Sequence, residues 1–164
     1  MRKIIVMCLC VVIVLSLCAC DRRESRTDVP VNFYYCKEEI IYNSESGVIE
    51  AEIHEGDRFH SDVEAMLHAY LQGPRSNDNI LLVPEQTNLV SVKIEHERAY
   101  VVFTDAYSQL SGIELTTACS CIAMTLHDYT GVKEVIFSTE NELLDNKENF
   151  VIRVEDLVWQ DVME

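Results

Sequence analysis

Two cysteines in one short segment, Cys119 and Cys121, are a pair whose side chains could bind a metal ion or form a redox centre. Their segment has helical periodicity, and two positions along a helix turn the side chains to nearly opposite sides, so the pair cannot ligate one metal ion together. We therefore interpret both as small apolar side chains. A disulfide from Cys36 to Cys119 or Cys121 stays open, since it depends on whether the fold brings the Cα atoms close enough.

The other residue types that support catalysis do not form a recognisable constellation. No Gly-x-Ser-x-Gly motif and no glycine-rich phosphate loop occurs in the sequence. Glu38 and Glu39 are neighbours on a candidate strand and would point to opposite faces, which separates them as a carboxylate pair. The five histidines are scattered and give no metal-binding spacing: His54, His60, His68, His96 and His127. We predict no metal, no cofactor and no enzymatic activity.

The first nineteen residues have the features of an export signal. A basic start, Met1-Arg2-Lys3, precedes sixteen residues from Ile4 to Ala19 that are apolar except for Ser16. That length is short for a membrane-spanning helix and typical of the hydrophobic part of a signal peptide. A spanning helix is the alternative, and it would usually need a flanking stop signal.

The end of this segment, Leu17-Cys18-Ala19-Cys20, resembles the lipobox of bacterial lipoproteins. In those proteins the cysteine is acylated through its sulfur and the chain is cut just before it, so the resemblance implies a lipid on Cys20 and a signal peptide over 1–19. Each buried methylene of an acyl chain contributes about 0.8 kcal/mol, so two chains would hold the protein stably at a membrane. The alternatives are an ordinary signal peptide, or a lipid on Cys18, which fits less well because the large Leu17 would precede it.

The net charge of the chain excludes some classes of binding partner. The full chain has a formal net charge of −15, and loss of residues 1–19 removes two of its 13 basic residues and none of its 28 acidic ones, leaving −17. Such an acidic chain is not expected to bind nucleic acid, nor to lie on anionic lipid through a basic helix. We divide the remainder into a charged tether over 20–30, a domain over 31–138 and an acidic C-terminal extension over 139–164.

Apolar periodicity in the domain predicts alternating strands and two amphipathic helices. Ser61 with Glu64, and Ser111 with Glu114, are spaced as capping boxes at the helix starts. In chain order the expected elements are strands over 31–36, 38–43 and 47–53, a helix over 61–72, a hairpin over 89–104 turning at His96-Glu97, a helix over 111–130 and a strand over 132–137. The later stretch VIRVEDLVW fits an edge strand or a short helix. The order predicts an α+β fold, a small mixed or antiparallel sheet with two helices packed on one face.

Three segments together resemble the GerMN domain of GerM-like spore-germination and sporulation lipoproteins. They are MLHAYLQGP over 66–74, VPEQTNLVSVKIEHERAYVVF over 83–103 and TLHDYTGVKEVIF over 125–137. The resemblance is carried by their order and spacing, and it covers about 31–137. In the hairpin turn the family usually has glycine where this chain has Glu97, so we expect a different turn type here.

The resemblance implies a fold similar to ring-building-motif domains and a non-catalytic, membrane-anchored, extracytoplasmic module in sporulation or spore germination. Its partners would be the membrane, through Cys20, and envelope proteins or further copies of itself. We expect the helix over 61–72 and the hairpin over 89–104 to carry the partner surface. The alternative is a ligand-binding or cell-wall-acting lipoprotein, which would need a concave pocket with convergent polar groups.

Overall fold

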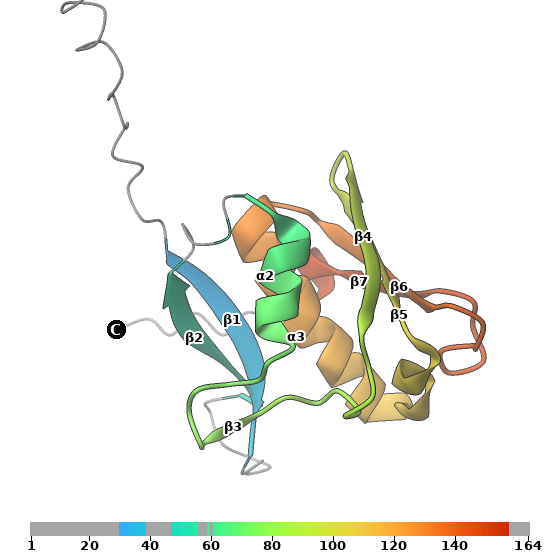
Figure 1. Ribbon diagram of the computed structural model, residues 1–164, viewed down its shortest axis with the longest axis horizontal. Coiled ribbons are helices and arrows are strands. Elements are labelled where there is room, and N and C mark those ends of the chain that lie inside the picture. Colours follow the sequence, from blue (N-terminus) through green and yellow to red (C-terminus); the bar gives the residue numbers. More distant parts are fainter. Residues whose placement is uncertain (1–29, 39–46, 56–58, 60, 158–164) are drawn as a thin grey trace, which may run out of the picture.

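The computed structural model describes residues 30–38, 47–55, 59 and 61–157 (Figure 1). The predicted signal peptide, Cys20 and nearly all of the strand expected over 38–43 lie outside these residues. The described elements, in chain order, are β1 (Pro30–Lys37), β2 (Ile49–Glu55), α2 (Val63–Tyr70), β3 (Asn79–Ile80), β4 (Leu89–Glu95), β5 (Arg98–Phe103), the 3-10 helix η2 (Asp105–Gln109), α3 (Gly112–Thr130), β6 (Glu134–Thr139), β7 (Phe150–Arg153) and the 3-10 helix η3 (Val154–Asp156).

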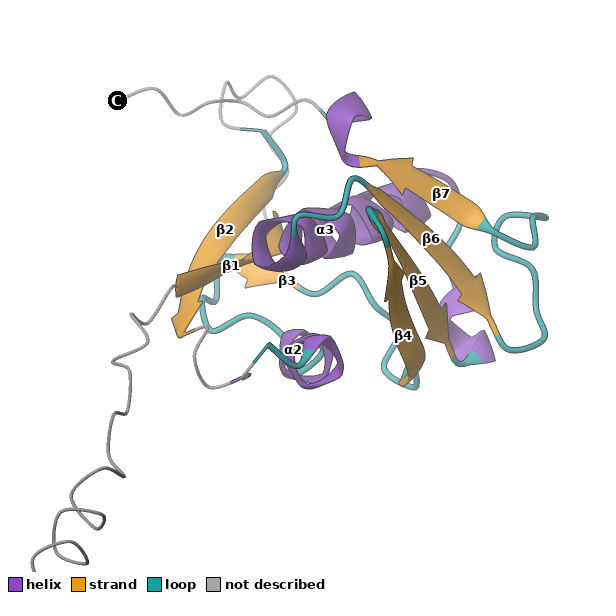
Figure 2. Ribbon diagram, turned by 90° about the horizontal axis from the view of Figure 1, so that it is seen from above, coloured by secondary structure: helices purple, strands orange, loops and turns teal. Residues whose placement is uncertain are grey.

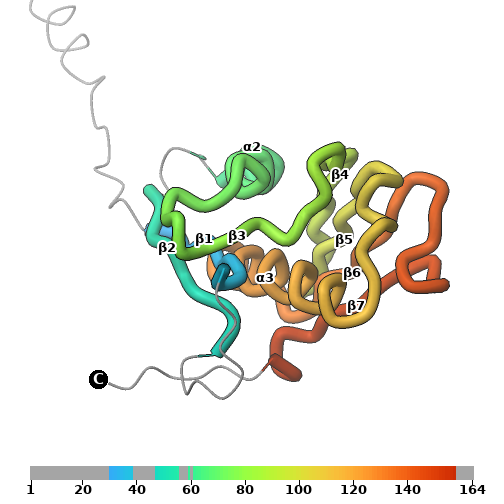
Figure 3. Tube along the Cα trace, turned by 90° about the horizontal axis from the view of Figure 1, so that it is seen from below, coloured from blue at the N-terminus to red at the C-terminus, as the bar shows by residue number. Residues whose placement is uncertain are grey.

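The strands form two sheets. Sheet A has the order β2-β1-β3 and is antiparallel, while sheet B has the order β4-β5-β6-β7, in which only β5 and β6 are parallel. The long helix α3 lies between the two sheets, and α2 lies on the same side of sheet A (Figures 2 and 3). The predicted α+β class with two helices is confirmed, and the structure adds that its strands divide into two groups.

The division into two sheets follows from the hydrogen-bond partners of the backbone N–H and C=O groups of β1. One edge of β1 pairs with β2 along its whole length, but the other edge pairs with β3 only at Cys36 and Lys37. Along the rest of that edge, side chains of α3 replace a strand. The Asn32 amide donates to Asp128 Oδ2 at 2.9 Å, and the Tyr34 amide donates to Thr125 Oγ1 at 3.0 Å. These two side chains of α3 accept from strand amides that have no strand partner on this side, so α3 closes this edge of sheet A.

One continuous core fills the space between the sheets. Alternate residues of β1, β5 and β6 point into it, as the period-two pattern predicts, and they meet the apolar faces of both helices. The rings of Tyr35 on β1 and Tyr70 on α2 stack with centroids 4.9 Å apart. Their hydroxyls bond reciprocally: Tyr35 donates to the Tyr70 carbonyl and Tyr70 donates to the Tyr34 carbonyl, each at 3.1 Å. These bonds fix α2 to sheet A while keeping the buried hydroxyls paired.

The helix ends correct the capping boxes predicted at Ser61 and Ser111 and confirm the helix end predicted at Gly131. Asp62, not Ser61, caps α2, and its side chain accepts from the Ala65 amide at 3.1 Å. Ser61 has φ 66°, so its side chain is turned away from the capping role that the Ser61–Glu64 spacing predicted. Ser111 does hold the N-cap position of α3, although its side chain makes no capping hydrogen bond. At the other end Gly131 adopts the predicted left-handed conformation with φ 77°.

The hairpin and the C-terminal strand complete sheet B. The hairpin turns at His96-Glu97 as predicted, and the positive φ falls on His96, at 57°, so Glu97 avoids the strain that the family's glycine position would impose. The stretch VIRVEDLVW supplies both alternatives, the edge strand β7 and then η3. β7 pairs antiparallel with β6, so this part of 139–164 belongs to the sheet.

Candidate interaction surface

The three cysteines that follow the predicted lipid site are buried free thiols in the structure. Burial raises the pKa of Cys36, of Cys121 and of Cys119, the last to about 12. The Cys119 sulfur lies 3.4 Å from the Tyr107 hydroxyl. A thiol is nucleophilic only as its thiolate, so these side chains act as small core residues, as the sequence predicted for Cys119 and Cys121.

The histidines that the structure describes have separate surroundings. The buried His54 ring stacks on Phe33 with centroids 4.2 Å apart. His127 Nδ1 lies 2.7 Å from the Val132 carbonyl beyond the end of α3. His68 is exposed beside Glu64, and His96 lies in the hairpin turn. Within the described ranges, no group of three or more His, Cys, Asp or Glu side chains could hold a metal ion, and no helix is long and apolar enough to cross a membrane.

The predicted partner surface divides between buried and exposed residues. The apolar face of α2 is used in the core, where Met66, Leu67 and Tyr70 are buried. The hairpin is more open, because β4 is an edge strand and its Val90 and Ile94 are exposed. An edge strand also presents backbone groups that have no strand on one side. Of the two predicted elements, the hairpin therefore offers more surface to a partner.

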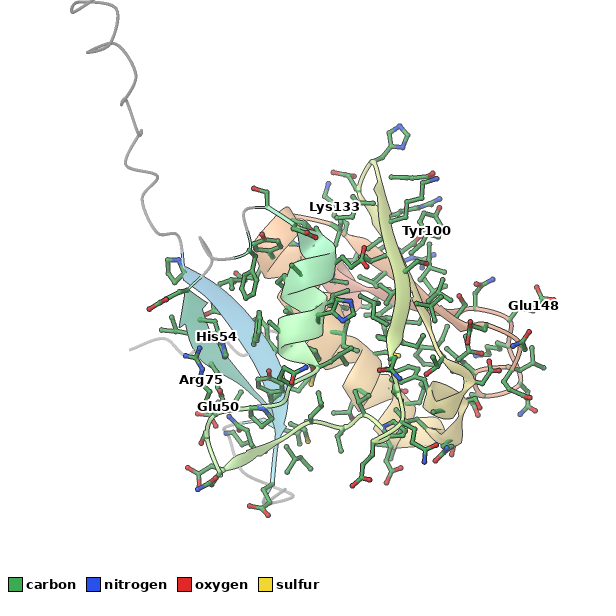
Figure 4. The ribbon with its side chains drawn as sticks, in the orientation of Figure 1. Glu50, His54, Arg75, Tyr100, Lys133 and Glu148 are labelled. Atoms are coloured by element: carbon green, nitrogen blue, oxygen red, sulfur yellow. The ribbon has the colours of Figure 1, made fainter. Side chains whose placement is uncertain are left out.

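A second exposed feature is the face of sheet B that points away from the helices, which we call the outer face. The strand registers place three rows of side chains across it. The middle row is Lys93, Tyr100, Ile136 and Val151, one residue from each strand. Figure 4 shows Tyr100 on the side of the hairpin that faces away from α2. Three apolar residues in one solvent-facing row are unusual, because the uncovered face of an antiparallel pair is normally polar.

The remaining rows of the outer face flank this apolar row. Val102 lies between Ser91 and Ser138 on one side. Tyr100, Val102 and Ile136 are only half-buried, and they are not among the apolar residues of the described chain that pack against the core. Val151 is 47% exposed. The outer face therefore carries a band of apolar side chains that no described helix covers.

The third row of the outer face alternates in charge across the four strands. Its members, in strand order, are Glu95, Arg98, Glu134 and Arg153. Glu134 is shared: Arg98 Nε lies 2.9 Å from one carboxylate oxygen and Arg153 Nε lies 3.2 Å from the other. Lys93 of the middle row pairs with Glu95. The outer face holds three basic and two acidic side chains, in contrast to the −15 of the whole chain.

Sequence reasoning did not identify the outer face. On β5 the residues Tyr100 and Val102, which alternate with the buried Ala99, Val101 and Phe103, are also apolar. The same pattern occurs in β6, where Val135 and Phe137 point into the core and the apolar Ile136 between them points to the outer face. Apolar residues on both faces of a strand indicate that other elements of the chain cover both faces, or that one face binds another molecule.

A family model described as "Germane: Sporulation and spore germination" matches residues 25–145 of the chain. The comparison with curated proteins finds no match. Among solved structures, the tandem GerMN domains of the sporulation protein GerM from Bacillus subtilis superpose with a TM-score of 0.50 and 20% sequence identity. That alignment covers 76% of this chain and 43% of the tandem chain, so this protein spans less than half of that relative. The likeness establishes the fold.

A second solved structure, a candidate lipoprotein from Clostridium perfringens, superposes with a TM-score of 0.44 at 16% identity. The alignment covers 79% of this chain and 89% of that one. With this score it adds nothing to the comparison with the tandem domains.

Proposed function

The chain belongs to the Germane family of sporulation and spore germination, and on that premise we propose that it is a non-catalytic interaction or assembly module held at the outer side of the cell membrane. The observation that carries the proposal is the family match over residues 25–145, which includes most of the described fold. The GerMN-like arrangement of α3 between two sheets is consistent with it. The domain would act through its surface, binding envelope proteins or further copies of itself.

The proposed attachment is a lipid on Cys20. The basic start, the length of the apolar stretch and the residues Leu17-Cys18-Ala19 before Cys20 all support it. From Cys20 the chain reaches β1 at Pro30, and ten residues span at most about 35 Å when fully extended. The module would therefore act close to the membrane surface, within reach of other membrane-attached proteins.

The absence of catalysis is part of the proposal. The cysteines that the structure describes are buried with raised pKa values, which suppresses the thiolate form. The hydroxyls of Thr125, Thr130 and Ser120 donate to carbonyls of their own helix and are not held by a general base. Surface recognition accounts for the exposed features of sheet B better than a reaction does.

Replacement of Cys20 tests the anchor. Cys20→Ala removes the sulfur that would carry the lipid, so we expect the protein to lose incorporation of a labelled fatty acid. Cys18→Ala is the matched control, since alanine is a small residue and is acceptable at that position of the motif. Labelling that survives in Cys20→Ala would contradict the anchor without affecting the family assignment.

Deletion of the gene tests the process. In a spore-forming host we expect fewer spores, or spores that germinate slowly, because the family acts in sporulation and germination. Spore counts after heat treatment and the loss of optical density during germination measure the two stages separately. Restoration by the wild-type gene is the control, and normal sporulation together with normal germination in the deletion strain would refute the proposed process.

A further inference from the structure

We propose that the outer face of sheet B is the contact surface of a two-fold symmetric dimer of this chain. The inference deepens the proposed function, on which it rests, by naming the partner as a second copy and the surface as the rows that contain Tyr100 and Glu134. The first reason is the apolar band of Tyr100, Val102, Ile136 and Val151, which no described helix covers. Two sheets that pack face to face bury such side chains between them.

The second reason is that the charged row is complementary to itself. In a two-fold contact the same patch is used by both copies. An axis parallel to the strands and between β5 and β6 reverses the strand order, so β4 faces β7 of the second copy and β5 faces β6. Glu95 then faces Arg153 of the second copy, and Arg98 faces Glu134 of the second copy, and the symmetry generates each of these pairs twice. Every charge of the row meets the opposite sign.

The arginines have donors available for such contacts. Each reaches Glu134 of its own chain through Nε. A guanidinium has further N–H donors in a fixed plane, which can meet a carboxylate of the second copy. The side chains of both arginines are 60% exposed, whereas that of Glu134 is 17% exposed, so the cationic groups extend furthest from the sheet.

The same axis brings the middle rows of the two copies face to face. In the middle row Tyr100 faces Ile136 of the second copy, and Lys93 faces Val151. Elsewhere the two copies, each with a net charge of −17 once residues 1–19 are removed, repel each other, so the contact depends on the opposed charges of the row and on the apolar band. A contact between single four-stranded faces is small, so the dimer is expected to form where anchoring concentrates the chains.

The test pairs two full-length chains that carry different epitope tags. One has Tyr100→Cys and the other has Ile136→Cys, and both are expressed together and treated in cells with a permeant bismaleimide. Packed sheets lie about 10 Å apart, so a reagent of that reach should join the two positions. We expect a cross-linked dimer that contains both tags. A chain with only its native cysteines gives the background, which the raised pKa values of the buried thiols keep low.

The matched control moves the cysteine to the other sheet. Ile53 is 72% exposed on the edge strand β2 of sheet A, and chains with Ile53→Cys should give no cross-linked dimer above the background. Equal cross-linking of the Ile53→Cys chains, or no mixed dimer from the Tyr100→Cys and Ile136→Cys chains, overturns the proposal.

Inversion of the charged row tests the symmetry. A chain with Glu95→Arg, Arg98→Glu, Glu134→Arg and Arg153→Glu keeps opposite signs between neighbouring strands, and a circular dichroism melt checks its folding. When both tagged chains carry the inversion, the mixed dimer should persist. When only one does, like charges face each other and the mixed dimer should be lost. Its persistence in that mixture would overturn the two-fold arrangement.

These results are independent of the tests of the proposed function. A chain that is labelled at Cys20 and needed for spores, but that gives no mixed dimer, refutes only the dimer. A mixed dimer with normal sporulation and germination refutes only the process.

Discussion

At the scale of single residues, the carboxylate of Glu52 joins β2 to the loop after α2. It accepts hydrogen bonds from the Arg75 amide at 2.9 Å, the Ser76 amide at 3.1 Å and Asn79 Nδ2 at 3.0 Å. Burial by itself raises the pKa of Glu52, but the bonds from Asn79, Arg75 and Ser76, with His54 nearby, lower it below the ordinary value of 4.5. The ionised form is therefore the one that holds the loop.

This direction fixes how Glu52 contributes to stability as pH changes. A lowered pKa in the folded state stabilises the fold above the unfolded-state value, and the contribution is lost as pH falls through the folded-state value. We expect Glu52→Gln to lower the free energy of unfolding at about pH 7, with a smaller difference from wild type at about pH 3. Urea unfolding at the two pH values measures it.

Glu50→Gln, at an exposed position of the same strand, is the control for a lost negative charge, and it should destabilise the fold less than Glu52→Gln at about pH 7. A constant difference between Glu52→Gln and wild type at both pH values would show that the carboxylate does not hold the loop through its ionised form.

At the scale of elements, the contact between α3 and the free edge of β1 takes the place of a missing strand. The Thr125 hydroxyl accepts from the Tyr34 amide at 3.0 Å and donates to the Cys121 carbonyl at 2.9 Å. The Thr125 side chain is fully buried, and Tyr34 is half-buried. Through this hydroxyl, α3 supplies the hydrogen-bond acceptor that a neighbouring strand would otherwise give to the Tyr34 amide.

Thr125→Val keeps the shape of the side chain and removes the acceptor. An unsatisfied buried amide costs about 1–3 kcal/mol, so we expect the free energy of unfolding to fall by about that amount. Hydrogen exchange at the Tyr34 amide should also become faster. Thr116→Val is the matched control, because its exposed hydroxyl donates only to the Gly112 carbonyl of the same helix. Similar losses in both variants would argue against a special role for the β1 edge.

At the scale of the whole molecule, the C-terminal segment is part of the core. Ile152 on β7 and Val154 in η3 are buried, and the Val154 amide donates to the Lys133 carbonyl at 2.9 Å. Both elements contact α3. β7 and η3, which lie within the stretch predicted to be an acidic extension over 139–164, thus close one side of sheet B.

A chain that ends at Asn149 tests this role. Removal of β7 and η3 exposes the β6 edge and part of α3, so we expect the cooperative thermal transition to be lost or shifted to much lower temperature. Circular dichroism during heating measures it. A chain that ends at Leu157 keeps every described element and is the control, which should retain the cooperative transition. Equal melting of the two truncations would contradict the prediction.

The sequence determined the local features of this protein, because they depend on neighbouring residues. Period-two alternation located β1, β5 and β6, apolar stripes located the two helices, and Gly131 marked the end of α3. The family followed from three short segments whose order is visible in the chain. The signal for lipid attachment at Cys20 is also local, and it stays a prediction because that residue lies outside the described ones.

Tertiary structure decided which strands share a sheet and which side chains share a surface. The cap at Asp62 depends on the backbone at Ser61, which turns into a positive φ that no spacing rule records. The use of Thr125 as a partner for β1 joins residues 91 positions apart. The charged row of the outer face comes from four strands, and only their registers align it. Pairing between distant segments is set by packing and backbone hydrogen bonds, so one-dimensional patterns do not contain it.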